Sequence, residues 1–245
     1  MKPADHFKYD ENGVPVLAKD EIEGIADTVR QWGAHQDLSQ PGQTEILGIY
    51  TKLQETGQLL FGYEHLNGPS VATKVLGKFR YGTPPVIILD AEHESTSSHA
   101  RTRFTLAHEL GHFALHRHRV IRKKEELVDT DEDLPRNLGP ENEAPDWAEW
   151  QANFFAGALL LPMKTIGIAL AKYQQACGIR KNVGVIYLDD STSSHRDFHQ
   201  ALEHLRYQYS VSKTVVEIRL RQLDRIKDRR SESSSTITKL GDLLT

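Results

Sequence analysis

One segment decides the interpretation of this 245-residue chain: Phe104-Thr-Leu-Ala-His108-Glu109-Leu-Gly-His112. It reads H-E-x-x-H within a helical pattern. This spacing places the two histidines about 40° apart around a helix and about 6 Å apart along its axis, so their ring nitrogens can converge on one metal ion. Glu109 lies about 100° from His108 around the helix, where its carboxylate can reach a metal-bound water without being a ligand.

The residues around this motif matter, because H-E-x-x-H also arises by chance in surface helices rich in Glu and His. Here they are largely apolar, which predicts a buried helix: Leu106, Ala107, Leu110, Gly111 and Ala114. Buried polar side chains need partners, because an unpaired polar group inside a protein is costly. Gly111, unfavourable within a helix, lets another element approach closely. We therefore interpret the segment as the helix of a zinc protease, with Glu109 as the general base.

The motif leaves one ligand unassigned, because a catalytic zinc ion usually has three protein ligands and a water. Two candidates follow closely. His116 would lie about 12 Å from His108 along a continuous helix, too far for both to bind one ion through bonds of about 2.0–2.1 Å. His118 stands at the sixth position after His112, but the intervening glycine of the metzincin extension is missing.

The third candidate is Glu149, in a second apolar helical pattern that starts at Asp146 and ends at Pro162. Glu149 can bind the metal while Asn153, four residues further on, accepts a hydrogen bond from the free N–H of a ligand histidine. Alternatively, Glu149 is a solvated residue in the first turn of its helix, where the helix dipole favours a negative charge.

Two motifs together resemble a known family. The pattern R-x-R-F-T-L-A-H-E-L-G-H-x-x-L-H at residues 101–116, followed after a variable loop by E-x-x-A-N-x-F-A-x-x-L-L-x-P at residues 149–162, resembles the ImmA/IrrE metallopeptidases. Residues 209–212 fit more weakly. The resemblance implies a zinc-dependent protease that acts on regulatory proteins such as transcriptional repressors. It implies His108, His112 and Glu149 as zinc ligands and Glu109 as the base. Asn153 stands where related zinc proteases often have Asp.

Composition limits the other possibilities. The net charge of −4 gives no overall electrostatic attraction to nucleic acid, so direct nucleic-acid binding is not expected. The single cysteine, Cys177, excludes an internal disulfide framework and a cysteine-based zinc site. The first residues are polar, and no run approaches the roughly 18 apolar residues of a membrane span. We therefore expect a cytoplasmic protein without a membrane partner.

The residue pattern predicts an α+β fold, in which a small mixed or antiparallel sheet packs on the H-E-x-x-H helix and a helical C-terminal region follows. Helical spacing predicts helices at residues 20–32 and 43–55, the second ending at Gly57. Three strands are expected at residues 59–63, 71–81 and 86–89. The last is a candidate edge strand that could hold a substrate by strand addition, although a short apolar run more often indicates a buried strand.

The connection at residues 117–145 is basic first and then acidic, and forms either a lid or a solvated insertion. Helices are expected at residues 165–175, 196–207 and 213–226. The last two form a helix-turn-helix pattern that either reads DNA or, as we favour, packs as core. We expect a zincin-like metallopeptidase domain at residues 1–190, a C-terminal helical, helix-turn-helix-like region at 191–230 and a Ser-rich flexible tail at 231–245.

These observations predict a Zn²⁺-dependent endopeptidase that cleaves a specific intracellular regulatory protein, a transcriptional repressor. The alternative is a non-catalytic antirepressor or DNA-binding regulator that keeps the zinc site only for structure. The intact Glu109 argues against the alternative, because structural zinc needs no general base.

Overall fold

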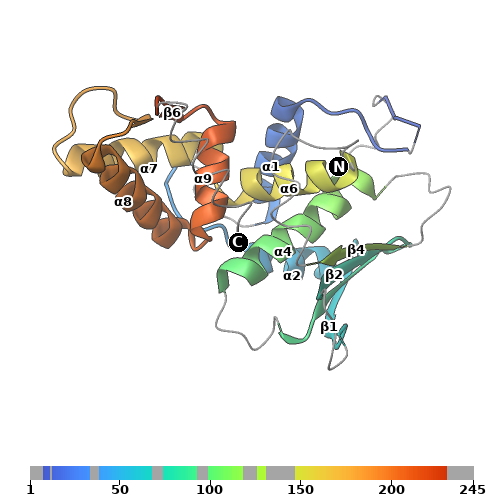
Figure 1. Cartoon of the computed structure of the whole chain (residues 1–245). Coiled ribbons are helices and arrows are strands. Elements are labelled where there is room, and N and C mark those ends of the chain that lie inside the picture. The colour runs from blue at the N-terminus through green and yellow to red at the C-terminus, as the bar shows by residue number, and fades with distance from the viewer. Residues whose placement is uncertain are drawn as a thin grey trace, which may run out of the picture. The chain divides into compact units, whose positions relative to one another are not determined.

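The structure, a computed structural model, describes residues 8–11, 13–33, 39–67, 74–92, 99–117, 126–130 and 147–230 (Figure 1). Its internal contacts divide the chain into two compact units. Unit 1 comprises Met1–Leu38 and Gln43–Pro162, and unit 2 comprises Ser39–Gly42 and Met163–Thr245. The units divide after Pro162, whereas the sequence led us to expect a domain boundary at residue 190. The expected tail at 231–245 lies outside the described residues.

Unit 1 contains a four-stranded mixed sheet in the order β1-β3-β2-β4. Its strands are β1 (Leu60–Glu64), β2 (Val75–Arg80), β3 (Val86–Asp90) and β4 (Glu126–Thr130). β1 pairs with β3 in parallel, whereas β2 runs antiparallel to both β3 and β4. The suggestion of an edge strand at residues 86–89 is therefore wrong. β3 is hydrogen-bonded on both sides and buried from Ile87 onward, which confirms the buried-strand interpretation.

The strand β4 is absent from the sequence-based assignment, which treats residues 117–145 as one long connection. Of the five residues of β4, only Leu127 and Val128 are apolar, too few for a strand pattern to stand out. In the structure Leu127 is buried opposite Phe79, and β2 supplies the backbone hydrogen bonds. Residues 126–130 thus form a strand because β2 pairs with them, and not because of their own residue pattern. The rest of the expected lid or insertion, residues 118–125 and 131–145, lies outside the described residues.

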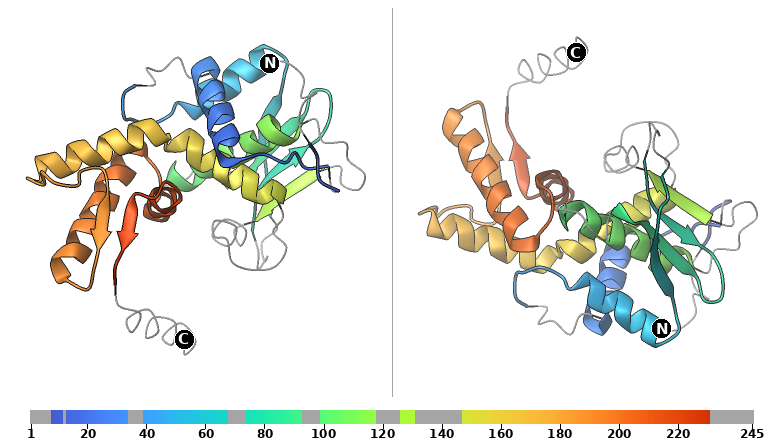
Figure 2. Two further views of the ribbon diagram at one scale, coloured as in Figure 1. Left: turned by 90° about the horizontal axis from the view of Figure 1, so that it is seen from above. Right: turned by 90° about the horizontal axis from the view of Figure 1, so that it is seen from below.

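The helices of unit 1 include α1 (Lys19–Gly33), α2 (Ile46–Glu55), α4 (His99–Gly111) and α6 (Trp147–Leu160). α4 contacts β2 and also packs against α6, which in turn packs against α1 (Figure 2). α2 begins three residues later than expected. Thr44 is instead tied to other elements, because its hydroxyl donates to the Leu159 carbonyl at 2.9 Å and its own carbonyl accepts from Arg103 at 2.9 Å.

Unit 2 contains α7 (Met163–Ala176), α8 (Thr192–Tyr209) and α9 (Lys213–Gln222), with a parallel pair of short strands, β5 (Ile186–Leu188) and β6 (Ile226–Asp228). α8 packs against α7, α9 and β5. The helix expected at residues 213–226 is too long. It ends at Gln222 because Asp224 adopts a left-handed conformation, with φ of 56°, and Ile226 pairs with Ile186.

Among the described residues, no single helix is long and apolar enough to cross a membrane. Only α6 and α7, taken together across their break, reach that length and composition.

Candidate metal centre

The structure brings three of the predicted site residues together. His108 and His112 lie on the last turn of α4 and the start of the turn that follows it, and Glu149 lies in the first turn of α6. The two Nε2 atoms are 2.9 Å apart, and the Glu149 carboxylate lies 3.2 Å from that of His108 and 3.5 Å from that of His112. Both histidines are buried. The donor atoms thus converge on one point inside unit 1.

Close packing of α4 on α6 makes this convergence possible. A Cβ atom added at Gly111 would lie 3.0 Å from the Cα of Ala152 and 3.1 Å from its carbonyl oxygen. Only glycine therefore lets the two backbones approach this closely at that position. The expectation that Gly111 admits a neighbouring element is met by α6, the helix that carries Glu149.

Asn153 fixes the orientation of the His108 ring. Its side-chain oxygen lies 2.8 Å from Nδ1 of His108, as expected from its position one turn after Glu149. An amide oxygen only accepts hydrogen bonds, so Nδ1 of His108 carries the hydrogen and Nε2 presents a lone pair. The ring nitrogen of His108 that lies near Glu149, Nε2, is therefore the atom that can bind a metal.

The charges at this point fit a metal ion. Burial raises the pKa of Glu149, but the neighbouring His112 and His108 outweigh it and lower the pKa well below its usual value, so the carboxylate is ionised. Nε2 of His108 and a carboxylate oxygen lie 3.2 Å apart and are shielded from solvent, close enough for one cation to contact both. Two imidazole nitrogens and one carboxylate oxygen are a ligand set typical of catalytic zinc.

Glu109 lies on another side of α4, between this helix and β2. Its side chain is only 1% exposed. A Cβ atom added at Gly77 in β2 would fall 2.2 Å from its Oε1 atom, so the carboxylate rests directly against the strand backbone. Burial and then the charge of Glu109 raise the pKa of Tyr50 well above its usual value. Sequence reasoning gave no role to Gly77, although a glycine within a strand often marks a close approach.

His116 does not join the metal cluster. After α4 the helix widens into a π-helical turn, η1 (His112–His116), so the distance derived for a continuous α-helix does not apply. Nδ1 of His116 lies 3.0 Å from Nδ1 of His112, on the side of that ring away from the cluster, and its Nε2 lies 3.0 Å from Oε1 of Gln151. His116 therefore supports His112. Sequence reasoning did not identify Gln151, and His118 lies outside the described residues.

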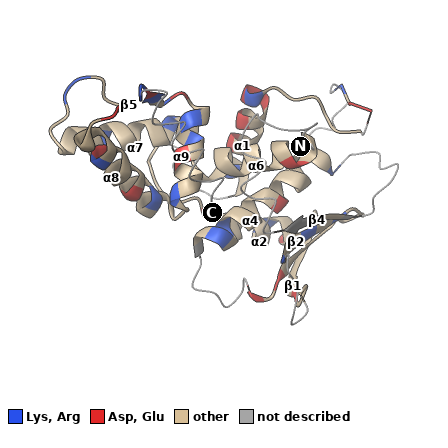
Figure 3. Ribbon diagram, viewed as in Figure 1, with Lys and Arg blue, Asp and Glu red and all other residues tan. Residues whose placement is uncertain are grey.

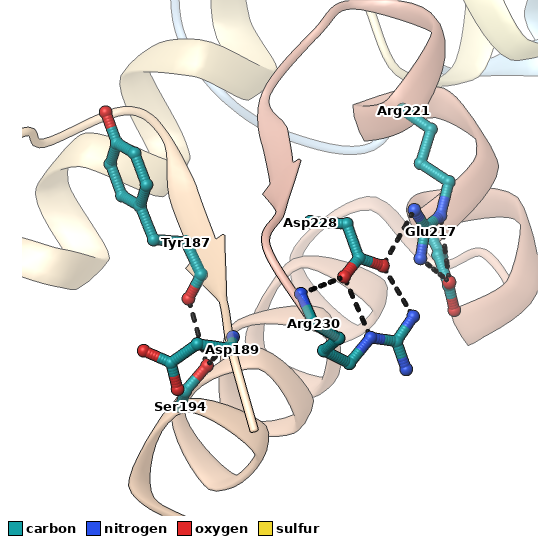
Figure 4. A network of polar contacts seen from close by, with 7 residues as sticks. All are labelled: Tyr187, Asp189, Ser194, Glu217, Arg221, Asp228 and Arg230. Carbon is teal, nitrogen blue, oxygen red and sulfur yellow. Dashed lines mark hydrogen bonds and ion pairs between the residues drawn. The ribbon is translucent and has the colours of Figure 1, made fainter. Parts of the chain in front are cut away.

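The basic residues of unit 2 are largely engaged within that unit. Charges of both signs occur along α8 and α9 (Figure 3). Arg221 pairs with Glu217 at 2.9 Å and with Asp228 at 3.7 Å, and Nε of Arg230 donates to Asp228 at 2.8 Å (Figure 4). The hydroxyl of Ser194 in α8 donates to the carbonyl of Tyr187 in β5 at 3.0 Å. These contacts tie α9 to β6 and α8 to β5, so they account for several charges that suggested a DNA-reading helix.

Comparison with protein families supports the resemblance seen in the sequence. The model of the IrrE N-terminal-like domain, a peptidase family, matches residues 65–221, well over half of the chain. The chain belongs to this family. The matched region of this IrrE-like chain contains the whole metal cluster, and the family together with the His-His-Glu cluster indicates a metallopeptidase of the zincin type with a metal ion. Comparison with curated proteins gave no match.

Proposed function

We propose that this IrrE-like protein is a zinc-dependent endopeptidase that cleaves one specific regulatory protein, a transcriptional repressor, inside the cell. One observation carries the proposal: the buried His108 and His112 and the half-buried Glu149 present three donor atoms to one point, and Glu109 lies beside His108 on α4. In this assignment the three residues are the zinc ligands, and Asn153 holds the His108 ring through its 2.8 Å contact.

The residues of the chain divide the chemistry between them. Bound zinc lowers the pKa of a water towards about 7 and polarises the scissile carbonyl. Glu109 takes the proton from the attacking water and passes it to the leaving amine. Its burial between α4 and β2 holds the carboxylate in one place, and such positioning is a large part of the catalytic effect.

The strand β4 is the best candidate to hold the substrate backbone. The edges of the sheet are β1 and β4. Glu109 rests on Gly77 of β2, and Gly77 pairs with Asp129 of β4, whereas β1 is separated from β2 by β3. Among the residues that the structure describes, the outer edge of β4 is therefore the sheet edge nearest to the proposed base. An extended peptide can add to such an edge through backbone hydrogen bonds.

A substrate bound in this way must offer an extended segment. A folded helix or strand would first have to unfold locally, so we expect cleavage in a flexible segment of the substrate. Family membership and the ImmA/IrrE-like motifs favour a DNA-binding repressor as that substrate.

Cleavage of a candidate repressor tests the proposal. The purified protein, zinc and a repressor encoded beside its gene should give one or two discrete fragments by mass spectrometry. Glu109→Gln should keep the metal and abolish the fragments, because the amide cannot accept the proton of the water. A chelator should have the same effect on cleavage. The opposite result is a repressor that is released from its operator without being cut, and that the Glu109→Gln protein releases equally well. That result would favour the alternative, a non-catalytic antirepressor that acts by binding the repressor.

A further inference from the structure

A line of buried hydrogen bonds leads away from His112 to the N-terminal arm, which we define as the described residues 8–11 and 13–18. Nδ1 of His112 lies 3.0 Å from Nδ1 of His116, and Nε2 of His116 lies 3.0 Å from Oε1 of Gln151. Nε2 of Gln151 donates to the carbonyl of Pro15 at 2.6 Å. All four residues are buried, so water does not replace these contacts.

The direction of every hydrogen bond in this line follows from its last member. A backbone carbonyl only accepts, so the amide NH₂ of Gln151 faces Pro15 and its oxygen faces His116. The amide oxygen also only accepts, so the hydrogen of neutral His116 is on Nε2 and its Nδ1 is an acceptor. Nδ1 of His112 must then donate, which leaves the lone pair of His112 on Nε2, the atom that faces Glu149.

We propose that His116 and Gln151 are positioning residues that hold His112 in its metal-binding tautomer, with the Pro15 carbonyl of the N-terminal arm setting the direction of the line. The proposal rests on the metal site of the proposed function. It concerns metal affinity rather than peptide cleavage. Different residues then hold the two ligand histidines: Asn153 contacts His108 directly, whereas His116 and Gln151 act on His112.

The arm is built to keep this carbonyl in place. Tyr9 and Pro15 form an isolated antiparallel bridge, and the backbone N–H of Val16 donates to the Lys8 carbonyl at 2.7 Å. Within the turn between them, the Val14 N–H donates to the Asp10 carboxylate at 2.7 Å. The Val14 side chain is 3% exposed, so it anchors the arm in the core of unit 1. The segment is therefore an ordered partner of α6 and contributes to the metal site from the other end of the sequence.

Substitution of Gln151 tests the proposal, because Gln151→Met keeps the length of the side chain and removes both polar ends. We expect zinc to bind about 10- to 100-fold more weakly, as for other partners of ligand histidines. Gln174→Met is the matched control. Gln174 is also buried and also bridges backbone groups, donating to Val185 at 2.9 Å and accepting from Gly184 at 2.6 Å, but it lies in unit 2. Its substitution should leave zinc affinity unchanged.

Two measurements on full-length protein decide the matter. Competition with a chelating dye gives the zinc affinity. NMR of isotope-labelled histidine ring nitrogens in the metal-free protein shows which nitrogen of His112 carries the hydrogen. Wild type should have it on Nδ1, and Gln151→Met should lose this preference. Should Gln151→Met fail to fold, His116→Phe, which keeps a ring but offers no acceptor, is measured in its place with the same expectation.

Unchanged zinc affinity in a folded Gln151→Met or His116→Phe protein overturns the proposal, as does a wild-type His112 that carries its hydrogen on Nε2. Neither readout involves peptide cleavage. A wild-type protein that binds zinc tightly, shows the expected tautomer and cleaves no repressor would therefore refute the proposed function while leaving this inference intact.

Discussion

Glu109 and Gly77 show how one residue without a side chain can determine the position of a proposed catalytic group. The carboxylate lies where the side chain of any other residue at position 77 would be. Gly77 is thus part of the wall that holds the proposed base, and its pairing with Asp129 links this wall to β4. A small change at position 77 should therefore affect catalysis before it affects the metal.

Gly77→Ala is expected to lower peptidase activity by about 100-fold, because its Cβ displaces a catalytic group and a misplacement of about 1 Å has such an effect. Zinc content should stay at the wild-type level, since no ligand is touched. Gly62→Ala in β1 is the control, because its added Cβ meets nothing within 4 Å. Rates and metal content are measured on the same preparations. Equal activity of both variants would show that Gly77 does not position Glu109.

The order of metal loss separates the proposed ligand from its supporting residue. Glu149→Ala should reduce zinc content after dialysis much more than His116→Ala, since the first removes a donor atom and the second removes only a contact to His112. Elemental analysis gives the zinc content. The ligand assignment fails if His116→Ala strips the zinc and Glu149→Ala retains it.

At the scale of whole elements, the site depends on how closely α4 approaches α6. α4 and the turn η1 that continues it supply two of the proposed ligands, and α6 supplies the third. From α6, Asn153 also contacts His108, and Gln151 contacts His116. α1 packs on α6, and the N-terminal arm that precedes it bonds to Gln151. The contact at Gly111 therefore sets both the stability of unit 1 and the geometry of the cluster.

Gly111→Ala should destabilise the protein even though alanine favours helix. The intrinsic gain is about 1 kcal/mol, whereas overpacking against the Ala152 backbone typically costs about 1–3 kcal/mol. The same change should weaken zinc binding, because it separates α4 from α6. Gly24→Ala in α1, whose added Cβ meets nothing within 4 Å, should be neutral or stabilising. Urea unfolding measures both, and a more stable Gly111→Ala protein would contradict the close contact.

For the whole molecule, the division into two units predicts where the metal stabilises the chain. All three proposed ligands belong to unit 1. A ligand that binds only the folded state stabilises it by mass action, by about 2.7 kcal/mol when its free concentration is 100 times its Kd. Zinc is therefore expected to stabilise unit 1, and unit 2 need not be stabilised with it.

Hydrogen exchange with mass spectrometry should detect the difference. Chelation of zinc is expected to speed exchange in residues 99–117 and 147–160 and to leave residues 163–230 unchanged. A change of equal size in both units would show that they unfold as one body. An absence of change in α4 and α6 would show that the cluster does not hold the metal.

The sequence alone predicted the helices, three of the strands and, through the family resemblance, the three residues of the candidate metal cluster. Each depends on local information: helical spacing, alternating apolar residues, and the separations within H-E-x-x-H and the second motif. Family membership follows from the same two motifs, and the matched region at 65–221 contains both. Asn153 could be predicted as a partner of a ligand histidine because one helical turn separates it from Glu149, and the structure shows that this histidine is His108.

Only the tertiary structure decided the features that depend on residues far apart in the chain. β4 exists because β2 offers it a partner, and β3 is interior because β1 pairs with its other side. Gly77 lies against Glu109, and Pro15 bonds to Gln151 across 136 positions of sequence. No local pattern encodes these contacts, since each depends on which surfaces meet when the elements pack. The proposed ligands can thus be read from the sequence, whereas the groups that hold them in place become visible only in the fold.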